Sequence, residues 1–348
     1  MKVLSVLSLA SLATASPLGS VAKYASALEG RDQPAVAVTE QNLDDFRFYV
    51  QHAGAAYCNV NQSPGTRITC ADSVCPDVEG DAVTVVNSFS GLVTGIAGYV
   101  ATDNARREIV LSVRGSNNIR NWITDVVFTW TDCPFVSDCK VHQGFSAAWD
   151  EIAVAAQAAI NTALAANPGY RVIATGHSLG GAVATLGAVY LRQNGIPIDT
   201  YSYGSPRVGN DKFANFVSNQ TGGEYRVTHT DDPVPRLPPI IFGYRHVTPE
   251  YWLSTDAASN DYPLNDIRVC AGIANIGCNG GTFGLDIDSH GQYFIAVSSC
   301  APPTIKTLAV SIQSASDDSA SDDISDEELE ERLNSWSQQD QDFVNNSD

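Results

Sequence analysis

Ser178 is the residue with the clearest potential for covalent chemistry. It stands in Gly176-His-Ser-Leu-Gly180, between an apolar run at Tyr170–Thr175 and a helical pattern at Val183–Leu191. A serine between two glycines at a sharp strand-to-helix turn presents its hydroxyl at the carboxyl end of a sheet, the arrangement called a nucleophile elbow. The amino end of the following helix favours the negative charge that develops there. The sequence therefore predicts a nucleophile at Ser178.

A serine nucleophile needs a base, and we predict that His290 supplies it. His290 follows a glycine-rich loop at Gly280-Gly281 and precedes the apolar run Tyr293-Phe-Ile. In enzymes with such an elbow the acid and then the histidine follow the serine along the chain. The other five histidines precede Ser178, adjoin it, lie on a strand or follow the candidate acid too soon: His52, His142, His177, His229 and His246.

The acid that orients the base should follow a strand. Asp231 and Asp232 come directly after the strand-like run Tyr225–His229. Only one carboxylate can orient His290, and the other should face solvent. The local pattern does not choose between them, because both lie at the end of the same strand.

Helical and strand-like patterns alternate between about Thr39 and Cys300. This order predicts an α/β fold with a largely parallel sheet and helices on its faces. Helices are expected at Asn42–Tyr57 and Gly144–Ala166 as well as after the elbow. Strands are expected at Ala82–Phe89, Gly95–Thr102, Glu108–Val113, Tyr170–Thr175, Thr200–Tyr203 and Tyr225–His229.

The eight cysteines predict four disulfides. Three pairs are close enough in sequence to close small loops, and the remaining two cysteines would join the two ends of the folded body. We predict no metal site, because no CxxC pair occurs and no histidine adjoins a cysteine. The predicted pairs are Cys70–Cys75, Cys133–Cys139, Cys270–Cys278 and Cys58–Cys300.

Several further motifs occur in the same order as in one known family. Over roughly Thr39 to Cys300 the chain resembles the secreted filamentous-fungal triacylglycerol lipases, most closely those of the Fusarium type. The resemblance implies an α/β-hydrolase fold with no cofactor. The matching motifs are Ala55-Ala-Tyr-Cys58, Arg114-Gly-Ser116, Asn121-Trp122, Gly176-His-Ser-Leu-Gly-Gly-Ala182, Tyr203-Gly-Ser-Pro-Arg-Val-Gly-Asn210 and Asp232-Pro-Val-Pro-Arg-Leu-Pro-Pro239.

The resemblance also implies roles for individual residues. It selects Asp232 as the acid, because this residue precedes x-Val-Pro-Arg, and His290 as the base, because it stands three residues before Tyr-Phe. The neighbours Ser289 and Gly291 depart from the family pattern, which often has Ala and Leu there.

An oxyanion hole needs two backbone N–H donors. The residue after the nucleophile, Leu179, supplies one, and the family resemblance supplies the other at Ser116. Directly after Ser116 an apolar face recurs at helical spacing, and the resemblance implies a mobile lid that covers Ser178 until it meets a lipid surface. The lid residues are Ile119, Trp122, Ile123, Val126 and Val127.

The implied activity is hydrolysis of acylglycerol esters at a lipid–water interface through a Ser178–Asp232–His290 triad and an acyl-enzyme. The alternatives within this chemistry are a phospholipase, a mono- or diacylglycerol lipase and a feruloyl-type esterase. Phe128 and Trp130 favour lipid. A non-catalytic protein that binds lipid or cell-wall material is the alternative of another class, and the complete triad speaks against it.

The net charge of the chain limits the kinds of molecule that it can bind. The chain of 348 residues has a formal net charge of −19, which argues against nucleic acid and anionic lipid as partners. From Ser314 onwards there are twelve acidic residues and one base, so the tail carries −11 of this charge. We expect a monomer.

The two ends of the chain are expected to lie outside the folded body. Residues 1–15 resemble a secretory signal peptide, so we expect a secreted protein without a membrane span. Residues 16–31 are a candidate pro-segment, 32–303 one α/β-hydrolase domain, and 304–348 an acidic, largely disordered tail. The helical spacing of Leu329, Leu333 and Trp336 leaves a tail helix that shields an apolar surface as the alternative. Glycosylation sequons begin at Asn61, Asn219 and Asn345.

Overall fold

An eight-stranded sheet with the order β1-β2-β3-β6-β7-β8-β9-β10 forms the central layer of the computed structural model. The structure describes residues 37–116, 118–255, 260–301 and 324–347. The strands of this sheet are β1 Thr84–Ser90, β2 Ala97–Asp103, β3 Glu108–Val113, β6 Arg171–His177, β7 Ile198–Tyr203, β8 Glu224–His229, β9 Glu250–Leu253 and β10 Ile267–Cys270.

The middle of the sheet is parallel, as the sequence predicted. Strands β3, β6, β7, β8 and β9 run in one direction, whereas β1–β2–β3 and β9–β10 pair antiparallel. Val113 pairs with Gly176, and His177 pairs with Tyr203. The register therefore brings the carboxyl ends of β3, β6 and β7 to one edge of the sheet.

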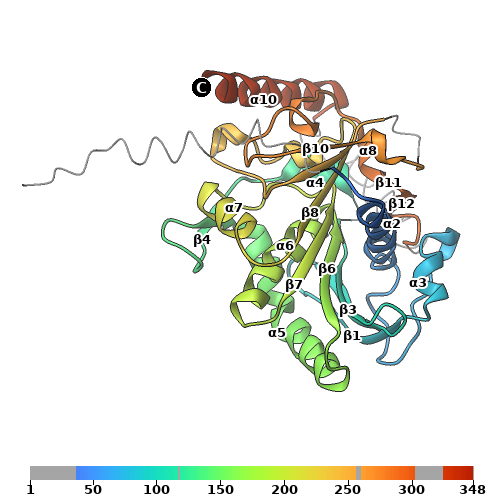
Figure 1. The fold of residues 1–348 in the computed structure, drawn as a ribbon. Helices are drawn as coiled ribbons and strands as arrows, with labels where there is room; N and C mark the ends of the chain where they lie inside the picture. The colour runs from blue at the N-terminus through green and yellow to red at the C-terminus, as the bar shows by residue number, and fades with distance from the viewer. Residues whose placement is uncertain (1–36, 117, 256–259, 302–323, 348) are drawn as a thin grey trace, which may run out of the picture.

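Helices cover both faces of this sheet (Figure 1). Strand side chains alternate between the faces, so Ile109 and Leu111 pack towards α5 and α6, while Val110 packs towards α2. The α/β-hydrolase architecture predicted from the sequence is confirmed. The helices are α2 Glu40–Ala55, α3 Pro76–Gly80, α4 Ile119–Asp125, α5 Gln143–Ala166, α6 Leu179–Gln193, α7 Asp211–Ser218, α8 Ile287–Gly291 and α10 Asp326–Asn346.

Two short hairpins lie outside the central sheet: β4 Trp130–Asp132 pairs with β5 Lys140–His142, and β11 Gln292–Tyr293 pairs with β12 Ile295–Ala296. The first hairpin continues the chain from α4 to α5. The second follows His290 directly, so it fixes the chain on the carboxyl side of the predicted base.

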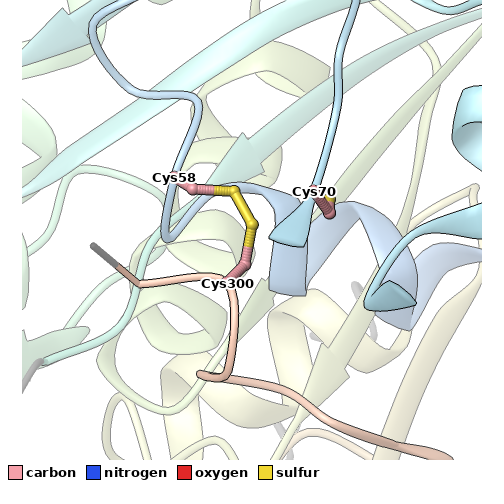
Figure 2. A group of neighbouring side chains, drawn as sticks. All are labelled: Cys58, Cys70 and Cys300. Carbon is pink, nitrogen blue, oxygen red and sulfur yellow. A yellow bond between two sulfur atoms is a disulfide. The ribbon is translucent and has the colours of Figure 1, made fainter. Parts of the chain in front are cut away.

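All four predicted disulfides are present. Cys58 and Cys300, which are 242 residues apart, join the end of α2 to the end of the folded body (Figure 2). The Cys70 sulfur lies beside this bridge. Among the described residues, two groups of side chains are spaced closely enough to bind a metal ion, and both contain cysteines of the Cys58–Cys300 and Cys70–Cys75 disulfides. The sulfur atoms of these cysteines are therefore already bonded in pairs.

The expectation of a disordered tail is wrong for residues 326–346, which form α10. Ser325 caps the helix by accepting a hydrogen bond from the Glu328 N–H, as its capping-box pattern allows. Leu329 and Leu333 are buried against the body rather than solvated. The helix forms because this apolar stripe finds a partner surface, a contact that local sequence does not encode.

Several predicted features of the two chain ends lie outside the part that the structure describes. Residues 1–31, with the signal peptide and the pro-segment, lie outside the described residues, as do residues 302–323 of the tail. Asn61, Asn219 and Asn345 are exposed, and their glycosylation stays a prediction. Within the described part of the chain, no helix has the length and apolarity that a membrane span requires.

Candidate active site

Ser178 forms the turn between β6 and α6, with φ 58° and ψ −131°. This left-handed conformation is unusual for a serine and requires close packing of strand and helix. A Cβ on Gly176 would lie 2.5 Å from the Gly180 carbonyl carbon, and a Cβ on Gly180 would lie 2.1 Å from the Val113 carbonyl oxygen. Both positions therefore require glycine, and the predicted elbow is present.

His290 and Asp232 meet at the same edge of the sheet. His290 lies on α8, and Asp232 follows the end of β8. The His290 Nδ1 lies 3.0 Å and 2.9 Å from the two carboxylate oxygens of Asp232. Asp231 instead lies 3.4 Å from the Ser289 hydroxyl and is partly exposed. The structure therefore distinguishes the two carboxylates that the local sequence left equivalent.

The Asp232 carboxylate is completely buried and receives two further hydrogen bonds. The Tyr293 hydroxyl donates to Oδ2 at 2.5 Å, and the Val234 N–H donates to Oδ1 at 2.9 Å. Burial raises the pKa of Asp232, but His290, Tyr293 and the Val234 N–H outweigh it and hold this pKa below its usual value. The site thus keeps a buried carboxylate ionised.

The Nε2 atom of His290 and the hydroxyl of Ser178 are the two reactive atoms that make none of these hydrogen bonds. Both are buried, and neither has a hydrogen-bond partner among the described residues. Since Nδ1 donates to Asp232, a neutral imidazole carries its lone pair on Nε2. The arrangement can therefore accept a proton at Nε2.

Two other histidines hold the backbone of the base. His177 Nε2 lies 2.8 Å from the carbonyl oxygen of His290, and His229 Nδ1 lies 2.9 Å from that of Ser289. A carbonyl can only accept, so both nitrogens donate. Tyr57 and Tyr262 then donate to the other ring nitrogens at 2.9 Å and 2.6 Å.

Burial keeps His177 neutral, because it lowers the pKa of this side chain to about 3. Sequence reasoning placed His177 beside the nucleophile with its side chain pointing away, and it gave no role to His229. The sequence analysis missed the hydrogen bonds of both histidines to the backbone because these bonds depend on strand register. The tyrosine spacing carries no signal for them.

Ser116 and Leu179, the predicted oxyanion-hole residues, both lie next to the elbow. A Cβ on Gly115 would lie 3.1 Å from the Ser178 Cβ, so the segment before Ser116 packs directly against the elbow. Leu179 begins α6, where the first N–H groups have no acceptor within the helix. Ser116 also lines a cavity of about 600 Å³ beside α4, together with Trp122, Val127 and Ala147.

The predicted lid residues form α4, but the helix is shorter than expected. It ends at Asp125, so Ile119, Trp122 and Ile123 are helical, whereas Val126 is extended. Val127 lies beyond the helix, and its carbonyl accepts from His142 Nε2 at 2.9 Å. The prediction of one helical face through Val127 is therefore wrong, because this β-branched pair leads into β4 in an extended conformation.

The reactive atoms of Ser178 and His290 are buried in this conformation. Ser178 is 1% exposed and His290 is 3% exposed, while Trp122 and Leu179 are partly buried and pack against the same apolar cluster. A substrate cannot reach Ser178 in this conformation.

Comparison with known proteins places the chain in a family. The family model described as Lipase (class 3) matches residues 110–242, which include Ser116, α4, Ser178 and Asp232. A protein of Fusarium solani named secreted mono- and diacylglycerol lipase 1 is 54% identical over 99% of this chain and 98% of its own length.

The chain belongs to the class 3 lipase family. It is therefore a carboxylic ester hydrolase of the serine type. The secreted mono- and diacylglycerol lipase A of Penicillium cyclopium is 38% identical over 82% of this chain and 95% of its own. The crystal structure of a mono- and diacylglycerol lipase from Aspergillus oryzae, 39% identical, covers 76% of this chain and 99% of that chain with a TM-score of 0.72.

The C-terminal helix of this lipase lies against α4 (Figure 1). Ile123 of α4 is buried in one cluster with Leu329 and Leu333 of α10. Arg120 donates to the Asp326 carboxylate at 2.7 Å, and Arg332 donates to the Thr124 carbonyl at 3.2 Å. Charged side chains from both helices therefore flank the apolar contact.

A second contact fixes the far end of α10. The buried Asp340 accepts from the Ile240 and Ile241 N–H groups at 2.8 Å and 2.9 Å and pairs with Arg207 at 3.2 Å. A buried carboxylate without such partners would be costly. Asp340 thus specifies where α10 docks on the lipase body.

Replacing Tyr293 with Phe tests the role of its hydroxyl. The variant removes one donor from the buried Asp232 carboxylate, so we expect a loss of about 1–3 kcal/mol in the free energy of unfolding at pH 7. The pKa of Asp232 would be lowered less in the variant. A carboxyl group whose pKa is lowered by folding stabilises the protein at pH values above its pKa in the unfolded chain, about 3.8 for Asp232. This stabilisation is lost as the pH falls through the pKa of the folded protein. The stability difference between wild type and Tyr293→Phe should therefore shrink below about pH 3.8. Urea unfolding at pH 7 and at low pH measures it.

Tyr203→Phe is the matched control. The Tyr203 hydroxyl is equally buried but donates to the Phe46 carbonyl at 2.7 Å, which does not titrate. Its cost should not change with pH. A Tyr293→Phe cost that is as large at low pH as at pH 7 would contradict the assignment.

Proposed function

We propose that this lipase is a secreted enzyme that hydrolyses acylglycerol esters at lipid–water interfaces through Ser178, Asp232 and His290. The observation that carries the proposal is the burial of Ser178 and His290, together with the packing of Trp122 of α4 and Leu179 against the same apolar cluster. From this we infer that α4 lies over the serine and must move before a substrate can enter. The names of the Fusarium and Penicillium relatives support secretion.

In the proposed mechanism His290 Nε2 takes the proton from Ser178 as Oγ attacks the ester carbonyl carbon. The N–H groups of Leu179 and Ser116 stabilise the oxyanion, and Asp232 stabilises the imidazolium. His290 then protonates the departing alcohol, which leaves an acyl-enzyme. Water deprotonated by His290 hydrolyses that ester and releases the fatty acid.

Movement of α4 explains the preference for an interface. Opening exposes Trp122 and Ile123, which costs free energy in water because apolar surface is hydrated. Contact with acyl chains removes this cost, so a lipid surface shifts the equilibrium towards the open form. The lid residues predicted from the sequence take this role, with Val126 and Val127 as the segment that follows the helix.

Triacylglycerols are the substrate that the sequence predicted, and mono- and diacylglycerols are the second candidate. The names of the relatives favour the second. Comparing initial rates on emulsified trioleoylglycerol and dioleoylglycerol decides between them. A phospholipase would instead hydrolyse phosphatidylcholine vesicles fastest, and a feruloyl-type esterase would prefer a dissolved aromatic ester.

The main test follows ester hydrolysis with increasing tributyrin concentration through its solubility limit. We expect the rate to jump when droplets form and Ser178→Ala to abolish hydrolysis at every concentration. Smooth saturation without a jump would retain the serine mechanism but contradict interfacial opening. Hydrolysis that survives in Ser178→Ala would contradict the catalytic proposal.

The acid is tested separately with two asparagine substitutions. Asp232→Asn removes the acceptor that orients His290, so we expect kcat to fall by roughly 10⁴-fold. Asp231→Asn should retain most of the activity, because this residue contacts Ser289 rather than the imidazole. The opposite ranking would transfer the role to Asp231.

We also propose that α10 holds the lid in its covering position. Opening must separate Ile123 from Leu329 and Leu333, and burial of one such side chain is worth about 1.5–3 kcal/mol. Leu333→Glu weakens this contact, so we expect about tenfold higher initial rates on emulsions at low surface area. A chain that ends at Pro303 should behave likewise.

Ser335→Glu is the control, because it adds the same charge to the exposed side of α10. It should leave the emulsion rate unchanged. Circular dichroism checks that each variant keeps its fold. Unchanged emulsion rates in a folded Leu333→Glu variant would disprove the lid-holding role.

A further inference from the structure

The turn between β1 and β2 exposes two adjacent aliphatic side chains. Leu92 is 97% exposed and Val93 is 91% exposed, the largest values among the large apolar side chains of the described residues. Single exposed aliphatic residues are ordinary on protein surfaces. Two neighbours that are almost fully solvated on one tip form a projecting apolar point.

Glu151 of α5 holds this tip in one conformation. Its carboxylate accepts from the Val93 N–H at 2.8 Å, from the Thr94 N–H at 2.9 Å and from the Thr94 hydroxyl. A Cβ on Gly91 would lie 2.2 Å from the same carboxylate, so only glycine permits this approach. The hydrogen bonds from Thr94 and Val93 also hold the pKa of Glu151 below its usual value. The two aliphatic side chains are therefore presented by a backbone fixed at several points.

The tip lies at the same edge of the sheet as Ser178, because β2 begins beside the ends of β3 and β6. Arg114, two residues before Ser116, donates to the Gly95 carbonyl at 2.9 Å. The α5 helix makes a second connection, because Ala147 lines the cavity beside the lid and Glu151 follows one turn later. Val127, which is 67% exposed, lies on the rim of the same cavity.

We propose that Leu92 and Val93 form a fixed anchor that inserts into the surface of the acylglycerol substrate and brings the lid to it. The inference rests on the proposed function and adds a lipid-binding site that does not depend on lid opening. A short aliphatic point suits an uncharged acyl surface, since insertion removes apolar area from water and needs no charge on the lipid. The net charge of −19 disfavours an anionic surface.

The order of events follows from the geometry. Leu92 and Val93 are exposed while Ser178 is covered, so the anchor can engage lipid before α4 moves. Binding then places the lid at the interface, where its apolar side chains find acyl chains. The anchor acts on surface binding and leaves the chemical step unchanged.

The test combines Leu92→Ser and Val93→Ser. In the Ser178→Ala background, partition of the protein onto triolein droplets should fall at least about tenfold. In the active enzyme, the droplet area needed for half-maximal rate should rise by a similar factor. The maximal rate at saturating area and the rate on a dissolved short-chain ester should not change.

Two controls separate a specific anchor from general surface apolarity. Leu92→Met with Val93→Ile keeps the tip apolar and should retain wild-type partition. Val154→Ser removes another aliphatic side chain, 83% exposed and further along α5, and should have no effect. Equal losses from Val154→Ser and the double variant, or wild-type partition of the double variant, would overturn the inference.

The partition assay is independent of catalysis, so its failure differs from failure of the proposed function. If Ser178→Ala still hydrolyses the dissolved ester, the catalytic proposal fails whatever the droplets show. If Ser178→Ala is inactive while the serine double variant binds droplets normally, the anchor alone is wrong.

Discussion

The buried Asp232 carboxylate is the constraint on which the rest of the site depends. An ionised group that is 0% exposed is stable only when hydrogen bonds replace its hydration. His290, Tyr293 and the Val234 N–H supply these bonds, and they come from segments before β9 and after β10. Satisfying one charge therefore fixes α8, the end of β11 and the turn after β8 relative to one another. Gly204 is part of this fit, since a Cβ there would lie 2.9 Å from the carboxylate.

Two buried tyrosine–histidine pairs support the base by donating hydrogen bonds to the adjacent backbone carbonyls of Ser289 and His290. They act on backbone rather than on the imidazole, so the ring of His290 remains free to exchange a proton at Nε2. Buried imidazoles suit this task, because a neutral ring can donate on one side and accept on the other. Rigid support around a mobile proton is the arrangement that preorganised sites require.

How much of this was predictable differs between features. The elbow and the four disulfides follow from residue spacing, and the structure contains both. The choice of Asp232 over Asp231 came from the family resemblance, and His290 lies beside Asp232. Strands β9 and β10 are four residues long and carry little periodic signal, so they escaped notice. The length of α4 was overestimated because apolar spacing continued into Val126 and Val127, while backbone conformation did not. The docking of α10 required knowledge of a surface made by Ile123, Val234 and Leu237, which only the folded chain assembles.

The Cys58–Cys300 bridge has a consequence for α10. It fastens the body's last described segment to α2, so α10 is joined to a fixed point on the lipase by the chain between residues 301 and 324. Docking of the helix on α4 is therefore an intramolecular contact, and the covalent tether makes it independent of protein concentration. A break anywhere in that tether would turn the helix into a separate peptide, and dilution would then remove a cover that covalent connection had made persistent.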